Sequence, residues 1–428
     1  MMTSGSVPTR PTSGGVLARR VLSQLRQATL TPPGVTRASY GAGEHYAHDL
    51  VRQEAEALGA IAQVDAAGNL YLTLPGRNRS LPRIVMGSHL DTVPHGGNYD
   101  GAAGVVAGIA VMADLVEQGA VPSRDLVVMA IRAEEAAWFP LSYPGSQAAL
   151  GLLHPTALQA RRSDTGKTLA EHMELAGFDP EAVRRGTTLI NARDIAAFVE
   201  VHIEQGPRLL ALDAPIAIVS AIAGGFRYVD ARCFGAYAHS GAEPRFSRRD
   251  SVLGFTDLVQ GLETEWDLLE RDGLEATITF GRVESDRTQH GGSRVLGELG
   301  FTLDVRSEEQ AVLDHLHQRI HTLQADIAAK RNVRFEMGQK SVWSPARMDA
   351  GVIQRLEASA AQLQMQPHRM PSGAGHDAAA FAAAGIPGAM VFVRNEHGSH
   401  NPHESMRPED LDQAIHLLVN FVTSFDER

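Results

Sequence analysis

The chain has 428 residues, of which 43% are hydrophobic and 21% charged, which is typical of a globular protein but too long for a single core of ordinary size. A formal net charge of −11 argues against a nucleic-acid or anionic-membrane partner. The only cysteine, Cys233, excludes an intrachain disulfide. We expect it to be a small buried side chain in a strand and the protein to be cytoplasmic.

The N-terminal segment is not expected to be a targeting signal. Residues 1–15 are rich in Ser, Thr, Gly and Pro and lack an apolar stretch, which predicts a disordered N-terminus and not a signal peptide. Elsewhere no apolar run approaches the roughly 20 residues that a membrane-spanning helix needs. The sequence therefore predicts neither export nor membrane insertion.

Helices and strands are expected to alternate over the first half of the chain. Apolar residues at helical spacing, or in a run of small residues, predict helices over 43–58 and 101–116. Short apolar runs predict a hairpin over 61–74 and strands over 84–86, 125–131 and 198–203. This alternation favours an α/β sheet, whose ligands bind at the carboxyl ends of the strands.

The pattern changes after residue 212. Strands are expected over 216–219, 227–234, 276–283 and 300–306, and helices over 248–270 and 308–330. We interpret 213–330 as an inserted α+β domain. The predicted fold class is α/β with two domains, in which residues 16–212 and 331–428 form the catalytic, metal-binding domain.

Metal-type side chains follow the predicted strands of this catalytic domain. His89 ends an apolar strand, and a Gly-rich loop leads from it to Asp100 at the start of a helix. Asp91, two residues after His89, is placed to orient that imidazole from behind. His202 ends another strand, and His400 lies in a Ser-His-Asn-Pro segment near the C-terminus. Imidazole and carboxylate ligands together suit zinc and its first-row neighbours.

A pair of carboxylates, Glu134 and Glu135, follows the strand predicted over 125–131. Side chains of neighbouring residues diverge, so one carboxylate can bind metal while the other accepts a proton from water. The set predicts a hydrolase with two metal ions. His376 and Asp377 are interpreted as a Gly-rich structural turn near the site, with a second ligand pair as the alternative.

Several blocks, taken in order, resemble the M20 metallopeptidase family and its hydantoinase/carbamoylase amidase branch: Gly87–Gly104, Glu134–Glu135, His202–Pro207, Ala238–Gly241, Ser372–Asp377 and Ser399–Pro402. The resemblance implies a zinc-exopeptidase-like catalytic domain with an inserted dimerisation (lid) domain. It also implies a homodimer and two divalent metal ions per subunit, with Zn²⁺ as the first choice and Mn²⁺, Co²⁺ or Ni²⁺ as alternatives.

The resemblance further implies a role for each metal-type residue. Asp100 resembles the ligand that bridges the two metals. His89 and His202 would complete one metal site, and Glu135 and His400 the other.

Five more residues resemble the parts of the branch that handle substrate. Glu134 resembles the general base. His239 resembles a histidine that reaches into the partner subunit's site and polarises the scissile carbonyl. Gln205 lies where the branch contacts the ureido or amide group, and Arg306 resembles the arginine that binds the substrate carboxylate, again across the dimer. Ser293 aligns with a substrate-contacting asparagine.

Three departures from the branch concern the substrate. Ala-Ala-Trp-Phe, with Trp138, replaces the usual Gly-Ser-Arg-Phe after the glutamate pair, Ser293 replaces the asparagine, and Ser240 replaces an alanine. We expect Trp138 and Ser293 to reshape the pocket.

The predicted reaction is hydrolysis of the linear C–N amide bond of an N-carbamoyl-L-amino acid or related ureido acid, with release of ammonia and carbon dioxide. The alternatives are an allantoate amidohydrolase or an amidase of N-acyl amino acids or peptides. A more remote alternative is a catalytically silent binding module.

Overall fold

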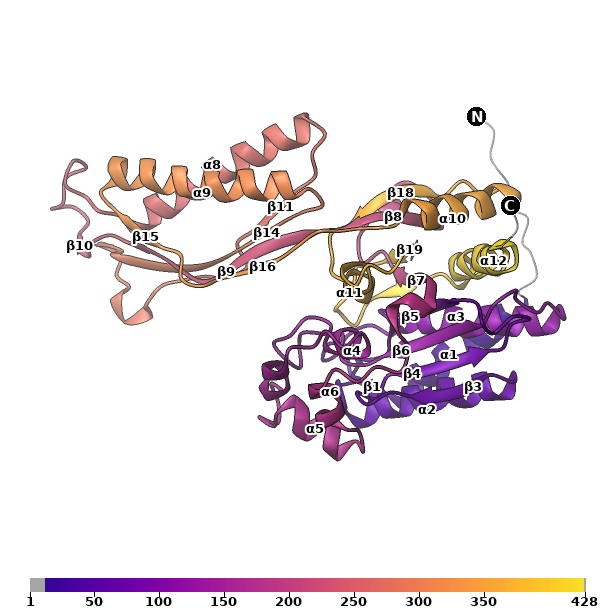
Figure 1. Ribbon diagram of the computed structural model, residues 1–428. Coiled ribbons are helices and arrows are strands. Elements are labelled where there is room, and N and C mark those ends of the chain that lie inside the picture. Colours follow the sequence, from indigo (N-terminus) through magenta and orange to yellow (C-terminus); the bar gives the residue numbers. More distant parts are fainter. Residues whose placement is uncertain (1–11, 427–428) are drawn as a thin grey trace. The chain divides into compact units, whose positions relative to one another are not determined.

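The computed structural model describes residues 12–426, which form two compact units (Figure 1). Unit 1 comprises the chain up to Ser220, Met348–Met370 and the chain from His376 onwards. Unit 2 comprises Ala221–Arg347 and Pro371–Gly375. The backbone therefore passes between the units four times.

These bounds differ from the inserted domain expected over 213–330, for reasons of strand pairing. β8 (Ile216–Ile222) pairs with β19 (Gly388–Val393) in the large sheet, which keeps its first residues in unit 1. β15 (Arg334–Glu336) and β16 (Lys340–Trp343) both pair with β9 (Gly224–Phe234), which keeps them in unit 2. The apolar pattern located the strands but not their partners.

The large sheet has parallel strands at its centre. Its order is β17-β8-β19-β7-β5-β6-β4-β3, and the four strands β19, β7, β5 and β6 are parallel to one another. Nearly every residue of these four strands is buried, as expected where helices cover both faces of a parallel sheet. The strands of this sheet not yet given bounds are β3 (Ile61–Val64), β4 (Leu70–Leu74), β5 (Arg83–His89), β6 (Leu126–Ile131), β7 (Ile195–Ile203), β17 (Ala346–Arg347) and β18 (His368–Ser372), which pairs with β8.

The helix α3 (Ala102–Glu117) is the most buried of unit 1. Its run of small apolar residues is buried from Ala102 to Leu115, and it contacts β5, β6 and β7. The other helices of unit 1 are α1 (Ser13–Ala28), α2 (Ala42–Ala57), α4 (Pro144–Ala149), α5 (Leu169–Leu175), α6 (Pro180–Arg184), α7 (Arg208–Ala211), α10 (Ala350–Gln362), α11 (Asp377–Ala383) and α12 (Pro408–Ser424), with 3₁₀ turns η1 (Pro155–Gln159) and η2 (Ala192–Asp194). Two small ribbons complete it: β1 (Leu30–Thr31) with β2 (Gly34–Val35), and β20 (Asn395–Glu396) with β21 (Ser405–Met406).

The expected disordered N-terminus is wrong where it can be examined. Residues 1–11 lie outside the described part of the chain, but α1 already begins at Ser13. The Thr12 side chain caps this helix, and the buried carboxylate of Asp114 accepts a hydrogen bond from the Gly14 amide at 2.7 Å. A Cβ on Gly14 would lie 2.3 Å from the Ala110 carbonyl oxygen, so the glycine permits this close helix contact.

Unit 2 has a six-stranded antiparallel sheet (Figure 1). Two long helices pack against this sheet, and the core of unit 2 lies between the helices and the sheet. Alternate residues of β14 (Glu298–Ser307) are buried, which matches a sheet packed on one face. The strand expected over 276–283 is wrong as one strand, because two short strands occupy this stretch. Cys233 is fully buried in β9, as predicted. The remaining elements are α8 (Ser251–Arg271), α9 (Gln310–Arg331), η3 (Arg287–Gln289), β10 (Ala238–His239), β11 (Thr277–Thr279), β12 (Val283–Glu284) and β13 (Arg294–Val295).

None of the helices in the described part of the chain is long and apolar enough to cross a membrane.

Candidate metal centre

Five of the residues singled out in the sequence meet at the carboxyl ends of the central strands. His89 is the last residue of β5, and His202 is the penultimate residue of β7. Asp100 lies two residues before the start of α3, Glu135 follows β6, and His400 lies in the loop between β20 and β21. This edge is where open α/β sheets bind their ligands, and here the order of the sheet brings together residues that are up to 311 positions apart.

These side chains form two groups that share Asp100. Donor atoms of His89, Asp100 and His202 all lie within 4.8 Å of one another, as do those of Asp100, Glu135 and His400. Oδ1 of Asp100 lies 3.1 Å from Nε2 of His202, and its Oδ2 lies 3.4 Å from Nε2 of His400. The carboxylate of Asp100 therefore faces both groups, as a ligand bridging two cations would.

The two buried histidines present their Nε2 atoms to the carboxylate. Nδ1 of His202 lies 2.9 Å from the Ile203 carbonyl oxygen and Nδ1 of His89 lies 3.1 Å from that of Asp91, so both Nδ1 atoms carry a hydrogen. In the neutral ring Nε2 then carries a lone pair, which faces the lone pairs of a carboxylate oxygen. A proton or a metal cation between the two atoms removes this repulsion. This orientation fits the donor set to a metal ion, whose binding displaces such protons.

Glu135 offers a second sign that a cation fits. Its Oε1 is buried without a hydrogen-bond partner, although it lies 3.5 Å from Nε2 of His400. Burial and the nearby charge of Asp100 raise the pKa of Glu135 to about 7. The hydrogen bond to Asp100 raises the pKa of His400 to about 9. A divalent cation would supply the partner that this oxygen lacks.

Glu134 lies next to Glu135 in the chain, but it belongs to neither donor group. Its Oε2 lies 3.9 Å from Nε2 of His89, and its side chain is 12% exposed. Burial raises the pKa of Glu134 well above its usual range, and the charge of Glu135 adds to the effect while that of His89 opposes it. A carboxylate with a raised pKa is a stronger base, which suits it to accept a proton from water.

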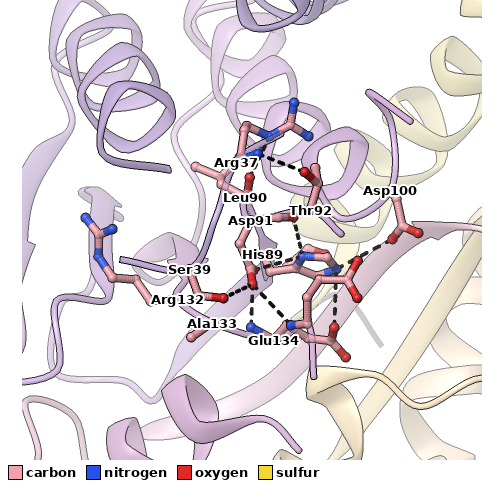
Figure 2. A network of polar contacts seen from close by, with 12 residues as sticks. Arg37, Ser39, His89, Leu90, Asp91, Thr92, Asp100, Arg132, Ala133 and Glu134 are labelled. Atoms are coloured by element: carbon pink, nitrogen blue, oxygen red, sulfur yellow. Dashed lines mark hydrogen bonds and ion pairs between the residues drawn. The ribbon is translucent and has the colours of Figure 1, made fainter. Parts of the chain in front are cut away.

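Asp91 holds the turn that carries both glutamates (Figure 2). Its two carboxylate oxygens accept hydrogen bonds from the backbone amides of Glu134 and Glu135, both at 3.1 Å. Its Oδ1 also lies 3.3 Å from Nδ1 of His89, and its Oδ2 accepts from the Ser39 hydroxyl at 2.6 Å. One buried carboxylate thus orients a histidine and the following glutamate pair.

A second buried carboxylate, Glu44 in α2, was not recognised in the sequence. It forms an ion pair with Arg132 at 2.7 Å and accepts a hydrogen bond from the Ala133 amide at 3.1 Å. Ala133, directly before the glutamate pair, has a φ of 57°, in the left-handed region. A charged residue in the first turn of an amphipathic helix gives no sign in the sequence that it faces inward.

Two more buried groups beneath the site were also missed. Oε1 of Glu404 accepts hydrogen bonds from the amides of Tyr99 at 2.7 Å and Asp100 at 3.2 Å. Arg37 is fully buried beneath the loop that joins His89 to Asp100. Gly101 lets α3 begin against His89, because its φ is 65° and a Cβ would lie 2.4 Å from Cε1 of that ring.

His376 and Asp377 lie at the start of α11 and are both buried. The ring of His376 lies 4.5 Å from that of His202, and donor atoms of Glu200, His202 and His376 also lie within 4.8 Å of one another. The Ala378 amide donates to Oε2 of Glu200 at 2.8 Å. The segment is therefore the start of a helix that packs against the candidate ligands, with a donor atom of His376 close to those of His202 and Glu200.

Gln205 also touches the shared carboxylate. Its Nε2 donates to Oδ2 of Asp100 at 2.9 Å, and its Oε1 is buried without a hydrogen-bond partner. Both Gln205, with a φ of 64°, and His400, with a φ of 60°, have left-handed backbone conformations. The amide is thus held at the edge of the donor groups, and the family resemblance implies a contact to substrate at this residue.

His239 and Ser293 lie together in unit 2. The side chain of His239 is exposed on β10, and the Ser240 amide donates to the Ser293 carbonyl oxygen at 2.8 Å. Nδ1 of His239 accepts from the amides of Gly241 and Ala242, both at 3.2 Å. In the neutral ring the hydrogen is therefore on Nε2, which faces outward as a donor.

Arg306 lies far from His239 within unit 2. His239 is paired with Arg294 of β13, which leads into β14, and Arg306 is paired with Gly225 near the opposite end of β14 (Figure 1). At about 3.3 Å per residue, the intervening strands separate the two by roughly 30–40 Å. One small molecule cannot touch both residues of a single chain.

Trp138 is buried and does not line an open pocket. It is 6% exposed, packs in a small core with Tyr40 and Phe139, and donates from Nε1 to the Thr92 carbonyl oxygen at 2.7 Å. Trp138 therefore contacts the loop that contains Thr92 and lies in the core, away from an open pocket.

Comparison with known proteins agrees with this geometry. A family model described as Peptidase family M20/M25/M40 matches residues 85–424. An N-carbamoyl-L-amino acid amidohydrolase of Geobacillus stearothermophilus is 35% identical over 391 residues, covering 91% of this chain and 93% of that protein. An allantoate amidohydrolase of Bacillus subtilis is 30% identical over 396 residues, covering 91% and 92%. A crystal structure of a hydantoinase/carbamoylase family amidase from Burkholderia multivorans gives a TM-score of 0.85 at 28% identity, covering 96% of this chain and 97% of that chain.

Proposed function

The chain belongs to peptidase family M20/M25/M40 and is a metal-dependent amidohydrolase, and we propose that it hydrolyses the linear C–N amide bond of an N-carbamoyl-L-amino acid or a related ureido acid. The observation that supports this most directly is the pair of donor groups that share Asp100. Relatives that act on allantoate make this ureido acid the second candidate substrate.

In the proposed site, His89, Asp100 and His202 would hold one divalent cation, and Asp100, Glu135 and His400 would hold the other. Two such cations would supply Lewis-acid polarisation of the substrate carbonyl and would lower the pKa of water. Zinc is our first choice, because histidine and carboxylate ligands suit it, with manganese, cobalt or nickel as alternatives.

The remaining roles fall to the chain's own side chains. Glu134 accepts the proton of the attacking water and passes it to the leaving nitrogen, because its carboxylate lies beside the donor groups and outside both. In a homodimer, His239 of one subunit donates from Nε2 to the developing oxyanion in the site of the other. Gln205 is placed to hold the ureido group.

The direct experiment is an ammonia-release screen. Purified protein supplied with zinc, manganese, cobalt or nickel should release ammonia from N-carbamoyl-L-amino acids, ureidopropionate or allantoate. Removal of the metal with a chelator should abolish the activity, and added cation should restore it. N-acetyl amino acids release no ammonia, so a separate amine assay on them tests the amidase alternative. Failure with every ureido acid, in protein that holds metal, would contradict the proposed substrate class.

Arg306 leads to a prediction about the substrate carboxylate. Its Nε donates to Oδ1 of Asp304 at 2.8 Å, and its Nη1 donates to the Gly373 carbonyl oxygen at 3.0 Å. These two hydrogen bonds use two of the five N–H groups of the guanidinium, and the others are available to a substrate carboxylate. Arg306→Ala should therefore raise KM by about 10–200-fold, as expected for one lost charge-assisted interaction, with unchanged metal content.

Arg227 provides a matched control. Its Nε also donates to Asp304, at 2.6 Å, and both guanidinium groups lie 5.6 Å from the Trp343 ring centroid. Arg227→Ala disturbs the same cluster but should leave KM for the acid nearly unchanged. Arg306→Lys should rescue poorly, because an ammonium group lacks the planar fork. Equal hydrolysis of a ureido acid and its neutral amide by the wild type would contradict this role.

A further inference from the structure

The loop between His89 and Asp100 surrounds a charged side chain that the proposed chemistry does not use. Arg37 is fully buried, and it is among the largest side chains with no solvent exposure. Within residues 12–426, the hydrogen bonds of its guanidinium go to carbonyl and amide oxygens and none goes to a carboxylate. Burial lowers the pKa of Arg37 to about 10, against the opposing charges of Glu404, Asp91 and other nearby carboxylates, and this still leaves the guanidinium charged at neutral pH. A buried charge without an ion pair requires compensation from oriented oxygen atoms.

That compensation comes from both ends of the loop. Nε of Arg37 donates to the Leu90 carbonyl oxygen at 2.6 Å. Its Nη1 donates to Oδ1 of Asn98 and its Nη2 to the Asn98 carbonyl oxygen, both at 3.2 Å. Leu90 directly follows His89, and Asn98 precedes Asp100 by two residues. One rigid planar group thus connects the two ends of the segment that separates the candidate ligands.

The backbone of Arg37 bonds to Thr92, near the start of the same segment (Figure 2). Its amide donates to Oγ1 of Thr92 and its carbonyl oxygen accepts from the Thr92 amide, both at 2.9 Å. Asn98 in turn donates from Nδ2 to the Leu22 carbonyl oxygen in α1 at 2.9 Å. We call the contacts of Arg37 with Leu90, Thr92 and Asn98 the Arg37 brace. Through Asn98, this brace is anchored to α1 in unit 1.

We propose that Arg37 is a positioning residue, whose guanidinium spans the loop from Leu90 to Asn98 and holds His89 and Asp100 at the spacing that a shared metal site requires. The inference rests on the proposed function only in taking His89 and Asp100 as metal ligands. The planar fork is what fits here, because three N–H groups reach three oxygen atoms on two residues eight positions apart. Groups that orient ligands in this way typically contribute about 10–100-fold to metal affinity.

Two substitutions separate the brace from the charge. Arg37→Lys keeps a positive charge but cannot reach both ends of the loop, and Arg37→Met removes charge and brace together. We expect both to weaken metal binding by about 10–100-fold in chelator competition, and to similar extents. We also expect the backbone amides of 90–98 to exchange hydrogen faster in both metal-free variants than in the metal-free wild type.

Arg394 offers a matched control in the same unit. It is also largely buried, but its guanidinium bonds to Asp410 and Asp213, outside the loop. Arg394→Lys should therefore leave metal affinity and the exchange of residues 90–98 unchanged, whatever its cost to global stability. Should Arg37 variants fail to fold, Asn98→Ala removes a single acceptor of the brace and should produce a smaller change in the same direction.

The outcomes separate this inference from the proposed function. If wild-type protein binds no divalent cation, the proposed function fails, yet exchange in the metal-free proteins still tests the brace. Equal metal affinity of wild type and Arg37→Lys would mean that the span of the guanidinium does not contribute to metal affinity. The positioning role would then be overturned. Unchanged loop exchange in both Arg37 variants would overturn it as well.

Discussion

Replacing Glu134 by glutamine should lower kcat by about 10²–10⁴-fold while the protein keeps its metal, because proton transfer by a positioned carboxylate contributes on that scale. Glutamine has nearly the same shape but cannot accept the proton of water. Oε2 of Glu134 lies 3.9 Å from Nε2 of His89, and Glu134 is a member of neither donor group. Steady-state kinetics and metal analysis on the same preparation would measure the two effects separately.

The neighbouring residue is the natural control for this experiment. Glu135 is a member of the donor group with Asp100 and His400. Glu135→Gln should therefore lose or weaken one metal ion, whereas Glu134→Gln should not. Loss of a metal from the Glu134 variant, or full retention of both by the Glu135 variant, would require the two roles to be exchanged or abandoned.

Removing His239 should cost about 10²–10³-fold in kcat, the usual effect of deleting one oxyanion donor. The ring is exposed, and amide hydrogen bonds to Nδ1 leave its hydrogen on Nε2. Because the proposed acceptor belongs to the partner subunit, two inactive variants should complement one another. A hybrid dimer of His239→Ala and Glu134→Gln subunits contains one site with an intact base and an intact histidine, so mixing should restore activity.

The same experiment tells which subunit supplies Arg306. The separation of roughly 30–40 Å between His239 and Arg306 within one chain means that one substrate can contact both only if they come from two chains. His239→Ala and Arg306→Ala subunits should then complement each other, whereas Arg306→Ala and Glu134→Gln subunits should not. This differs from the arrangement that the family resemblance implied, with both residues across the dimer. Absence of complementation by any pair, after subunit exchange has been demonstrated, would place each complete site within one chain.

The candidate ligands could be predicted from the sequence because their signal is local. His89, Glu135 and His202 follow or end apolar strands, and strand ends of a parallel sheet meet at one edge. The small residues from 102 to 115 likewise predicted a helix that is buried all round.

The supporting residues could not be predicted in the same way. Arg37 precedes a loop, Glu44 lies in the first turn of an amphipathic helix, and Glu404 follows a candidate ligand segment. Each acts on backbone groups that lie from 53 to 305 residues away, in contacts that exist only after the chain has folded. The bounds of unit 2 differ from the predicted ones for a related reason. β15 and β16 are short, and their sequences do not indicate that they pair with β9.

The left-handed backbone at Gln205 and His400 has a consequence for how this protein can evolve. Both residues hold φ values near 60° without being glycine, which costs on the order of 1–3 kcal/mol each. Domains are stable by only about 5–15 kcal/mol, so these two positions offset a notable share of that stability. Glycine would relieve this strain at both positions but would remove the side chains that face Asp100. Stabilising substitutions are therefore easier to accommodate at surfaces and helix ends distant from these two residues.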